Sequence, residues 1–284
     1  MRTEKMVLVQ LTPWAEAQPN IRTILLTGSR AEPSRTPDDL SDYDVEVFVR
    51  DTTPFINSGA WLAAFGPIMV RWPLSPGPTF SVDWMTQLVL FEDGVRLDFQ
   101  IMALLPTTSR HLDSGYRVIV DKDDIAPQLP PPTYATYIIT PPTAATFSVR
   151  SNAFWWDIVY VAKALHRREL NYARYMLDGT IRFDKLQPLL EWHIGLRHHW
   201  TVDTGIYGRW FQRYLDADTW AVYESTFAGA DFDDNWRALF AMVELVRSLG
   251  TNLAEALGFP YPEETDKRVT AYMRRIEGLG RGEG

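Results

Sequence analysis

The sequence predicts an α+β protein in which a head with a mixed sheet is followed by a C-terminal helical bundle. Short segments in the first part of the chain alternate apolar and polar residues with the period of a strand. Six prolines lie between Ala126 and Pro142 and interrupt regular structure. Beyond them, apolar residues recur at helical spacing. We therefore expect two domains, residues 1–135 and 136–284.

Each strand of the head is predicted from its own pattern. The expected strands are 21–26, 44–49, 84–91 and 95–103. In the second of them, Val45 and Val47 lie on the side opposite Asp44. Between the last two, Glu92-Asp93-Gly94 is typical of a tight hairpin turn. The head is thus expected to contain a hairpin whose second strand carries an acid, Asp98.

The acids are the most informative residues of the head. Asp42 and Asp44 are one residue apart and point to the same side of a strand, where a hard divalent cation would offset their repulsion. Asp98 lies on the polar face of its strand and could join them. Alone, an Asp-x-Asp pair usually faces water. Together with Asp98 and the small residues Gly28-Ser29, which let a phosphate approach the backbone, it favours a metal site.

The second half of the chain is rich in tryptophan, and its long windows have helical periodicity. Two apolar faces carry the prediction: Phe154, Trp155, Ile158, Val159, Ala162 and Leu165, and then Trp236, Leu239, Phe240, Val243 and Val246. We expect most of these aromatic rings to fill a core and one or two to line a binding site.

Composition narrows the function classes. The chain has 284 residues and no cysteine, which excludes thiolate catalysis. Its formal net charge of −8 argues against a large non-specific nucleic-acid footprint. No apolar run is long enough for a membrane span. Residues 1–140 carry 17 acids and 11 bases, a balance that attracts a cationic small molecule, although solubility alone would also explain it. We expect a cytoplasmic monomer that binds neither membrane nor nucleic acid.

A Gly-Ser turn followed by Asp-x-Asp and a third Asp on a neighbouring strand resembles the nucleotidyltransferase superfamily, with its polymerase-beta-like head. More narrowly, the chain resembles the aminoglycoside 6-adenylyltransferases, the streptomycin-modifying family. The matching blocks are Leu26-Thr27-Gly28-Ser29-Arg30, residues 37–44, 90–94 with Leu97-Asp98, and 121–123, Pro142-Thr143-Ala144, Asn152 with Phe154-Trp155, Tyr160-Val161, Lys163, Trp192-His193-Ile194 and Arg213-Tyr214-Leu215.

The resemblance implies an ATP- and Mg²⁺-dependent transfer of AMP to a hydroxyl of an aminoglycoside, with the 6-position of streptomycin as the first candidate, and hence antibiotic resistance. It implies a catalytic domain at 1–135 and a substrate- and nucleotide-binding domain at 136–284. The implied residues are Asp42, Asp44 and Asp98 for catalysis and metal, Gly28, Ser29, Arg30, Lys122, Lys163 and Arg209 for the nucleotide, and Glu92, Trp155, Asp157 and Asp178 for the acceptor.

Plainer interpretations stay open for several of these residues. Lys122 could pair with the acids on either side of it, Lys163 could be a solvated surface lysine, and Arg209 could form an ion pair on the bundle. Asp178 precedes Gly179, a pair that is also common in turns.

Three positions depart from the family pattern. Thr27 stands where Glu or Asn is frequent, Ala153 stands where the family has Glu, and Ile206 stands where it has Lys. Two alternative functions therefore remain: a nucleotidyltransferase with another small hydroxylated acceptor, and a non-catalytic nucleotide-binding protein of the same fold.

Overall fold

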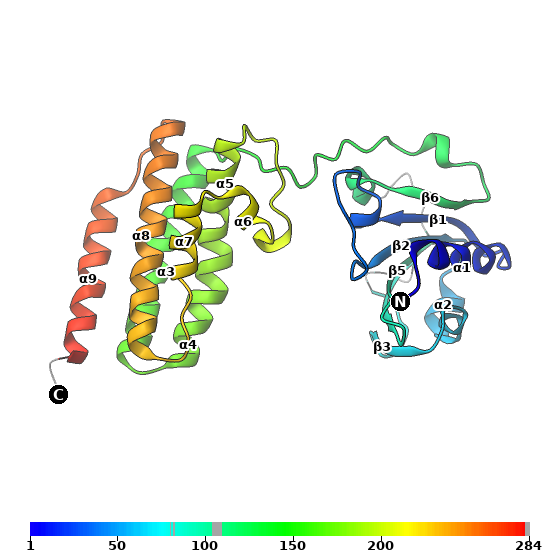
Figure 1. The fold of residues 1–284 in the computed structure, drawn as a ribbon, viewed down its shortest axis with the longest axis horizontal. Helices are drawn as coiled ribbons and strands as arrows, with labels where there is room; N and C mark the ends of the chain where they lie inside the picture. Colours follow the sequence, from blue (N-terminus) through cyan, green and yellow to red (C-terminus); the bar gives the residue numbers. More distant parts are fainter. Residues whose placement is uncertain (80, 82, 104–109, 282–284) are drawn as a thin grey trace. The chain divides into compact units, whose positions relative to one another are not determined.

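The computed structural model describes residues 1–79, 81, 83–103 and 110–281, which form two compact units, Met1–Thr136 and Tyr137–Gly284 (Figure 1). The first contains a mixed sheet with helices and the second contains helices, so the predicted α+β class is confirmed. The roles assigned to the two domains stay predictions.

The head is built on a six-stranded sheet. Its strands are β1 (Ile21–Thr27), β2 (Tyr43–Val49), β3 (Ile68–Trp72), β4 (Trp84–Phe91), β5 (Arg96–Met102) and β6 (Arg117–Asp121). Their order is β3-β4-β5-β2-β1-β6, and only the β2–β5 pair is parallel among these strands. The four predicted strands are confirmed, and Gly94 in the β4–β5 hairpin has a φ of +83°, as a tight turn requires.

Period-two alternation gives the sheet two different faces. Val45 and Phe99 represent the face that packs against α1 (Glu4–Glu16), α2 (Thr53–Asn57) and the 3₁₀ segment η2 (Ala60–Phe65). On the opposite face, a smaller cluster covers part of the sheet and leaves the end near Asp44 to polar residues. This cluster contains Leu25, Phe48, Met102, Leu112 and Leu129, the last two from the segment around η4 (Arg110–Ser114) and η5 (Ala126–Gln128).

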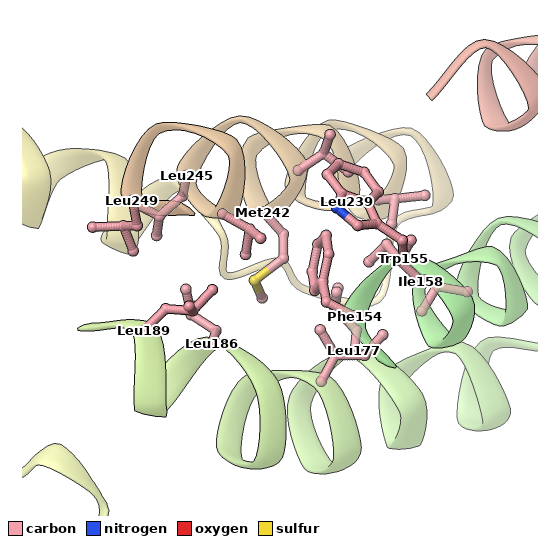
Figure 2. Close-up of a cluster of buried hydrophobic side chains, with 14 of the residues drawn as sticks. Phe154, Trp155, Ile158, Leu177, Leu186, Leu189, Leu239, Met242, Leu245 and Leu249 are labelled. Atoms are coloured by element: carbon pink, nitrogen blue, oxygen red, sulfur yellow. The ribbon is translucent and has the colours of Figure 1, made fainter. Parts of the chain in front are cut away.

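The second unit is a helical bundle. Its elements are α3 (Ala144–His166), α4 (Leu170–Arg174), the π-helix η6 (Tyr175–Leu186), α5 (Gln187–Arg197), η7 (Ile206–Gly208), α6 (Phe211–Tyr214), α7 (Ala217–Ser225), α8 (Phe232–Leu257) and α9 (Glu263–Arg281). The two predicted helical windows fall within α3 and α8. Figure 2 shows Phe154 and Trp155 among the leucines that fill the core between these helices. No helix within the described ranges has the length and apolar character that a membrane span requires.

Side chains define where the long helices begin. The Thr143 hydroxyl accepts a hydrogen bond from the Thr146 amide at 3.1 Å at the start of α3. The Asp231 carboxylate does the same for the Asp234 amide at 2.8 Å at the start of α8, and Gly258 ends that helix with a φ of +70°. Each cap satisfies a backbone group that the first or last turn leaves without a helical partner.

The π-helix contains a buried charge. The Arg182 side chain, in a residue only 3% exposed, donates to the hydroxyl and carbonyl oxygens of Thr226 at 2.6 and 2.9 Å. It also forms an ion pair with Asp178 at 3.0 Å and lies 3.7 Å from the centre of the Phe227 ring. Asp178 also pairs with Arg174. Asp178 and Gly179 lie within the π-helix, not in the turn that the sequence also allowed.

Replacing Arg182 should therefore cost more than replacing its neighbour. We expect Arg182→Met to lower the free energy of unfolding by roughly 2–4 kcal/mol, because the Thr226 oxygens lose a buried donor. Arg174→Met, which removes the more exposed partner of Asp178, should cost less than about 1 kcal/mol. Urea unfolding of the full chain measures both values, and equal losses would contradict the role given to Arg182.

Candidate active site

The pairing of β1, β2 and β5 brings the predicted site residues together. In the parallel β2–β5 pair Asp44 lies opposite Asp98, and in the antiparallel β1–β2 pair it lies opposite Thr27. Residues opposite one another in neighbouring strands point to the same face. Asp42 directly precedes β2. Two acids far apart in sequence thus lie side by side, on the sheet face opposite the main core of the head.

Gly28 is required by its position next to Asp44. Its φ is +67°, and a Cβ atom built on it would lie 2.0 Å from the Asp44 Oδ2 atom. Gly28 begins a single 3₁₀ turn, η1 (Gly28–Arg30), in which Ser29 is the middle residue. Only glycine combines this backbone conformation with so close a carboxylate. The Gly-Ser turn and the acid pair are therefore one structural unit.

Asp44 is the acid whose charge is least favoured. Burial, together with the negative charges of Asp98 and Asp42, raises the pKa of Asp44 to about 6, and Arg96 only partly opposes this shift. Burial also raises the pKa of Asp42, against the attraction of Arg96. A group of carboxylates that resists full ionisation has the chemistry of a divalent-cation site, because a cation favours the charged form of each acid.

Arg96, which is not among the predicted site residues, balances two of these acids. Its guanidinium contacts both carboxylate oxygens of Asp98, at 2.8 Å from Nε and 2.7 Å from Nη2. Its Nη1 lies 3.3 Å from Asp42 Oδ2. In the described part of the chain, no three acid or histidine side chains converge as a ready metal-ligand group. As the side chains stand, the Arg96 guanidinium bridges Asp42 and Asp98.

Arg30 supports the segment that leads into β2. Its side chain is 7% exposed and donates to the backbone carbonyls of Asp38, Ser41 and Asp42 at 3.0, 2.7 and 3.1 Å. It also stacks 3.9 Å from the centre of the Tyr43 ring. These bonds hold the segment that leads into β2. In this structure Arg30 positions Asp42, and its contact with nucleotide stays a prediction.

A pocket of about 330 Å³ lies beside the acids. It is lined by Arg2, Glu4, Arg30 and Arg96 together with the 37–43 segment, so it reaches Asp42. The pocket therefore offers space next to the guanidinium of Arg96.

The predicted acceptor residue Glu92 is exposed in the β4–β5 turn.

Lys122 pairs with neither of the adjacent acids that the sequence offered. Its ammonium donates to the carbonyls of Ala15 and Gln18 at 2.7 and 2.9 Å, at the C-terminal end of α1. Cations are favoured at that end of a helix. Asp123 instead forms an ion pair with Arg22. A nucleotide contact of Lys122 stays a prediction, and the ammonium has three N–H donors, of which these bonds use two.

The predicted residues of the helical unit occupy varied positions. Trp155 is 1% exposed and packs in the core, and its predicted contact with the acceptor stays a prediction. Asp157 pairs with Lys185 at 3.5 Å, and Asp178 is held by the two arginines described above. Lys163 is partly exposed and lies 6.0 Å from the centres of the Tyr160 and Tyr272 rings. Arg209 is exposed after η7.

Adjacent aspartates above a Gly-Ser turn, on a mixed sheet, are the features of a nucleotidyltransferase head. A family model described as streptomycin adenylyltransferase matches residues 1–276. The chain belongs to this family, whose members are nucleotidyltransferases.

Curated relatives match along nearly their whole length. Aminoglycoside 6-adenylyltransferase of Bacillus subtilis (strain 168) is 30% identical over 281 residues, covering 97% of this chain and 98% of its own. The enzyme of the same name from Campylobacter jejuni is 27% identical, covering 97% and 96%. A crystal structure of an aminoglycoside 6-adenyltransferase from Bacillus subtilis covers 98% of this chain and 99% of that chain, at 25% identity and a TM-score of 0.48.

Gly28→Ala should disturb the site and the fold together. We expect it to lower the free energy of unfolding by about 1–3 kcal/mol, because the added methyl group meets Asp44 and the left-handed backbone becomes strained. The matched control is Gly77→Ala, since a Cβ at Gly77 meets nothing within 4 Å. Denaturant unfolding compares the two variants, and equal stabilities would contradict the close approach of Gly28 to Asp44.

The raised pKa of Asp44 predicts a pH dependence of stability. Because the folded-state pKa is about 6 against an ordinary value of 3.8, the folded protein binds the proton more tightly than the unfolded chain does. This contribution to stability is complete below pH 3.8 and is lost as the pH rises through about 6, a change of roughly 3 kcal/mol.

Asp44→Asn should remove that loss. In EDTA, we expect the stability of the variant relative to the unsubstituted protein to increase between pH 4 and pH 7, as measured by urea unfolding at each pH. Asp39→Asn, at an exposed acid of the neighbouring segment, is the control and should leave the pH profile unchanged. Parallel profiles for Asp44→Asn and the unsubstituted protein would show that Asp44 ionises normally.

Proposed function

We propose that this protein transfers AMP from ATP to a hydroxyl of an aminoglycoside, with the 6-position of streptomycin as the first candidate, and so confers resistance. The observation that carries the proposal is the placement of Asp44 opposite Asp98, beside Gly28, in a chain that the streptomycin adenylyltransferase family matches over residues 1–276. The names of the curated relatives support the same acceptor class.

The acids supply the ligands that this reaction needs. Asp42, Asp44 and Asp98 would hold Mg²⁺, which when bound supplies positive charge to the phosphates of ATP. Gly28, which leaves no side chain in the way, and Ser29 would let the phosphates approach the turn backbone. The raised pKa of Asp44 fits this role, because a cation stabilises the charged carboxylate that burial disfavours.

Asp98 is the candidate base for the acceptor hydroxyl. In our proposal it takes the proton as the hydroxyl oxygen attacks the α-phosphorus, the bond from that phosphorus to the bridging oxygen breaks, and pyrophosphate leaves. AMP remains on the acceptor. No covalent enzyme intermediate is needed, because positioning and charge neutralisation lower the barrier.

A second acceptor class is favoured by one surface feature. Ile206, where the family pattern has Lys, is 59% exposed. An apolar side chain at a solvent-facing position changes what this segment can contact, so another small hydroxylated compound is the alternative acceptor. Cationic acceptors differ from uncharged ones in a measurable way, because screening by salt weakens only the binding of charged molecules.

Mass spectrometry of an aminoglycoside panel incubated with the protein, ATP and Mg²⁺ tests the proposal. We expect an AMP adduct of streptomycin.

The Asp98→Asn variant tests the base. It should bind ATP but lose most of its turnover, because an amide cannot accept the proton. Calorimetric titration with ATP separates binding from chemistry. Undiminished turnover in Asp98→Asn would refute its role as the base. If other hydroxylated compounds give AMP adducts and streptomycin gives none, the proposed acceptor is wrong but the proposed AMP transfer is supported.

A further inference from the structure

Arg96 differs from Arg30, the other arginine next to Asp42, in what it contacts. Its described hydrogen bonds and ion pairs go to the side-chain carboxylates of Asp42 and Asp98. Arg30, by contrast, donates to three backbone carbonyls and is almost fully buried. Bonds to backbone fix a loop, whereas bonds to two like-charged side chains offset their repulsion. Arg96 therefore acts on the charge of the site more than on the course of its backbone.

Arg96 also has space to move away from the acids. Its side chain is 42% exposed and lines the pocket of about 330 Å³ beside Asp42. Asp98, its main partner, is far more buried than the guanidinium itself. Because the Arg96 side chain is partly exposed, water can replace the hydrogen bonds of its guanidinium when it leaves the acids. The carboxylates would stay where the strands place them.

We propose that Arg96 is an internal counter-ion that competes with the divalent cation for Asp42 and Asp98 and is displaced when the cation binds. Without the cation, the guanidinium bridges the two carboxylates and offsets their repulsion. With the cation bound, it turns into the neighbouring pocket. This inference rests on the proposed function, since it concerns the metal that the transfer requires. It adds a residue that sets how tightly the metal is held.

The proposal makes a prediction opposite to that of a purely structural arginine. A residue that only orients Asp98 would leave a less ordered ligand when removed, and metal binding would weaken. A competing counter-ion, when removed, leaves three acids without their nearest positive charge, and metal binding would strengthen. The sign of the change in metal affinity therefore separates the two roles.

The experiment is a titration of the metal-stripped, full-length protein with Mn²⁺, in which electron paramagnetic resonance measures the free ion. We expect Arg96→Gln to bind Mn²⁺ about three- to tenfold more tightly than the unsubstituted protein. Arg96→Lys keeps the charge but lacks the planar fork that holds both oxygens of Asp98, so its affinity should fall between the two. It also provides a test if Arg96→Gln is poorly folded, which circular dichroism reveals.

Arg117→Gln is the matched control for the loss of one positive charge from the head. Arg117 is about as exposed as Arg96 and pairs with Glu4 instead of the three acids. Its Mn²⁺ affinity should change by less than about twofold. Equal or weaker Mn²⁺ binding by Arg96→Gln would refute the role of Arg96 as a competing counter-ion, but it would not contradict the proposed metal site. If the unsubstituted protein binds no Mn²⁺, the metal site of the proposed function fails as well.

Discussion

Repulsion among the carboxylates of Asp42, Asp44 and Asp98 is the constraint around which the head is arranged. Burial disfavours the charge of Asp44, and its two neighbours disfavour it further, so its pKa rises to about 6. Two neighbouring residues reduce the free-energy cost of crowding these acids. Gly28 leaves room for the Asp44 side chain, and Arg96 supplies a positive charge to the other two acids. The site is thus held together by compensation, and a divalent cation would complete it.

The parallel pairing of β2 with β5 makes this crowding unavoidable. Because the side-chain period of a strand is two, the register that sets Asp44 beside Asp98 also sets Val45 beside Phe99 on the other face. The apolar residues pack against α1 and α2, so the register cannot shift by one residue without burying the acids and exposing the core. Burial of the apolar residues therefore fixes the geometry of the acids, although the acids are not part of that core.

Features that depend on local sequence could be predicted, and those that depend on distant partners could not. Strands β1, β2, β4 and β5 and the side of β5 on which Asp98 lies follow from period-two alternation, which a short segment displays by itself. The hairpin turn follows from its Asp-Gly pair. Strands β3 and β6 were not predicted. Lys122 donates to Ala15 and Gln18, which lie more than a hundred residues away in sequence, so no local pattern predicts these bonds. Arg96 was predictable in principle, because it stands two residues before Asp98 on the same strand and therefore on the same face.

The distribution of charge partners indicates where a cation gains most. In the helical unit Asp157 already pairs with Lys185, and Asp178 already pairs with Arg174 and Arg182. A cationic acceptor that bound these acids would exchange one favourable pair for another, so the net gain would be small. At Asp44, burial and like charges leave the ionised carboxylate under-compensated, and a cation there relieves an existing cost. The strongest attraction for positive charge is therefore expected in the head, where Arg96 is positioned to moderate it.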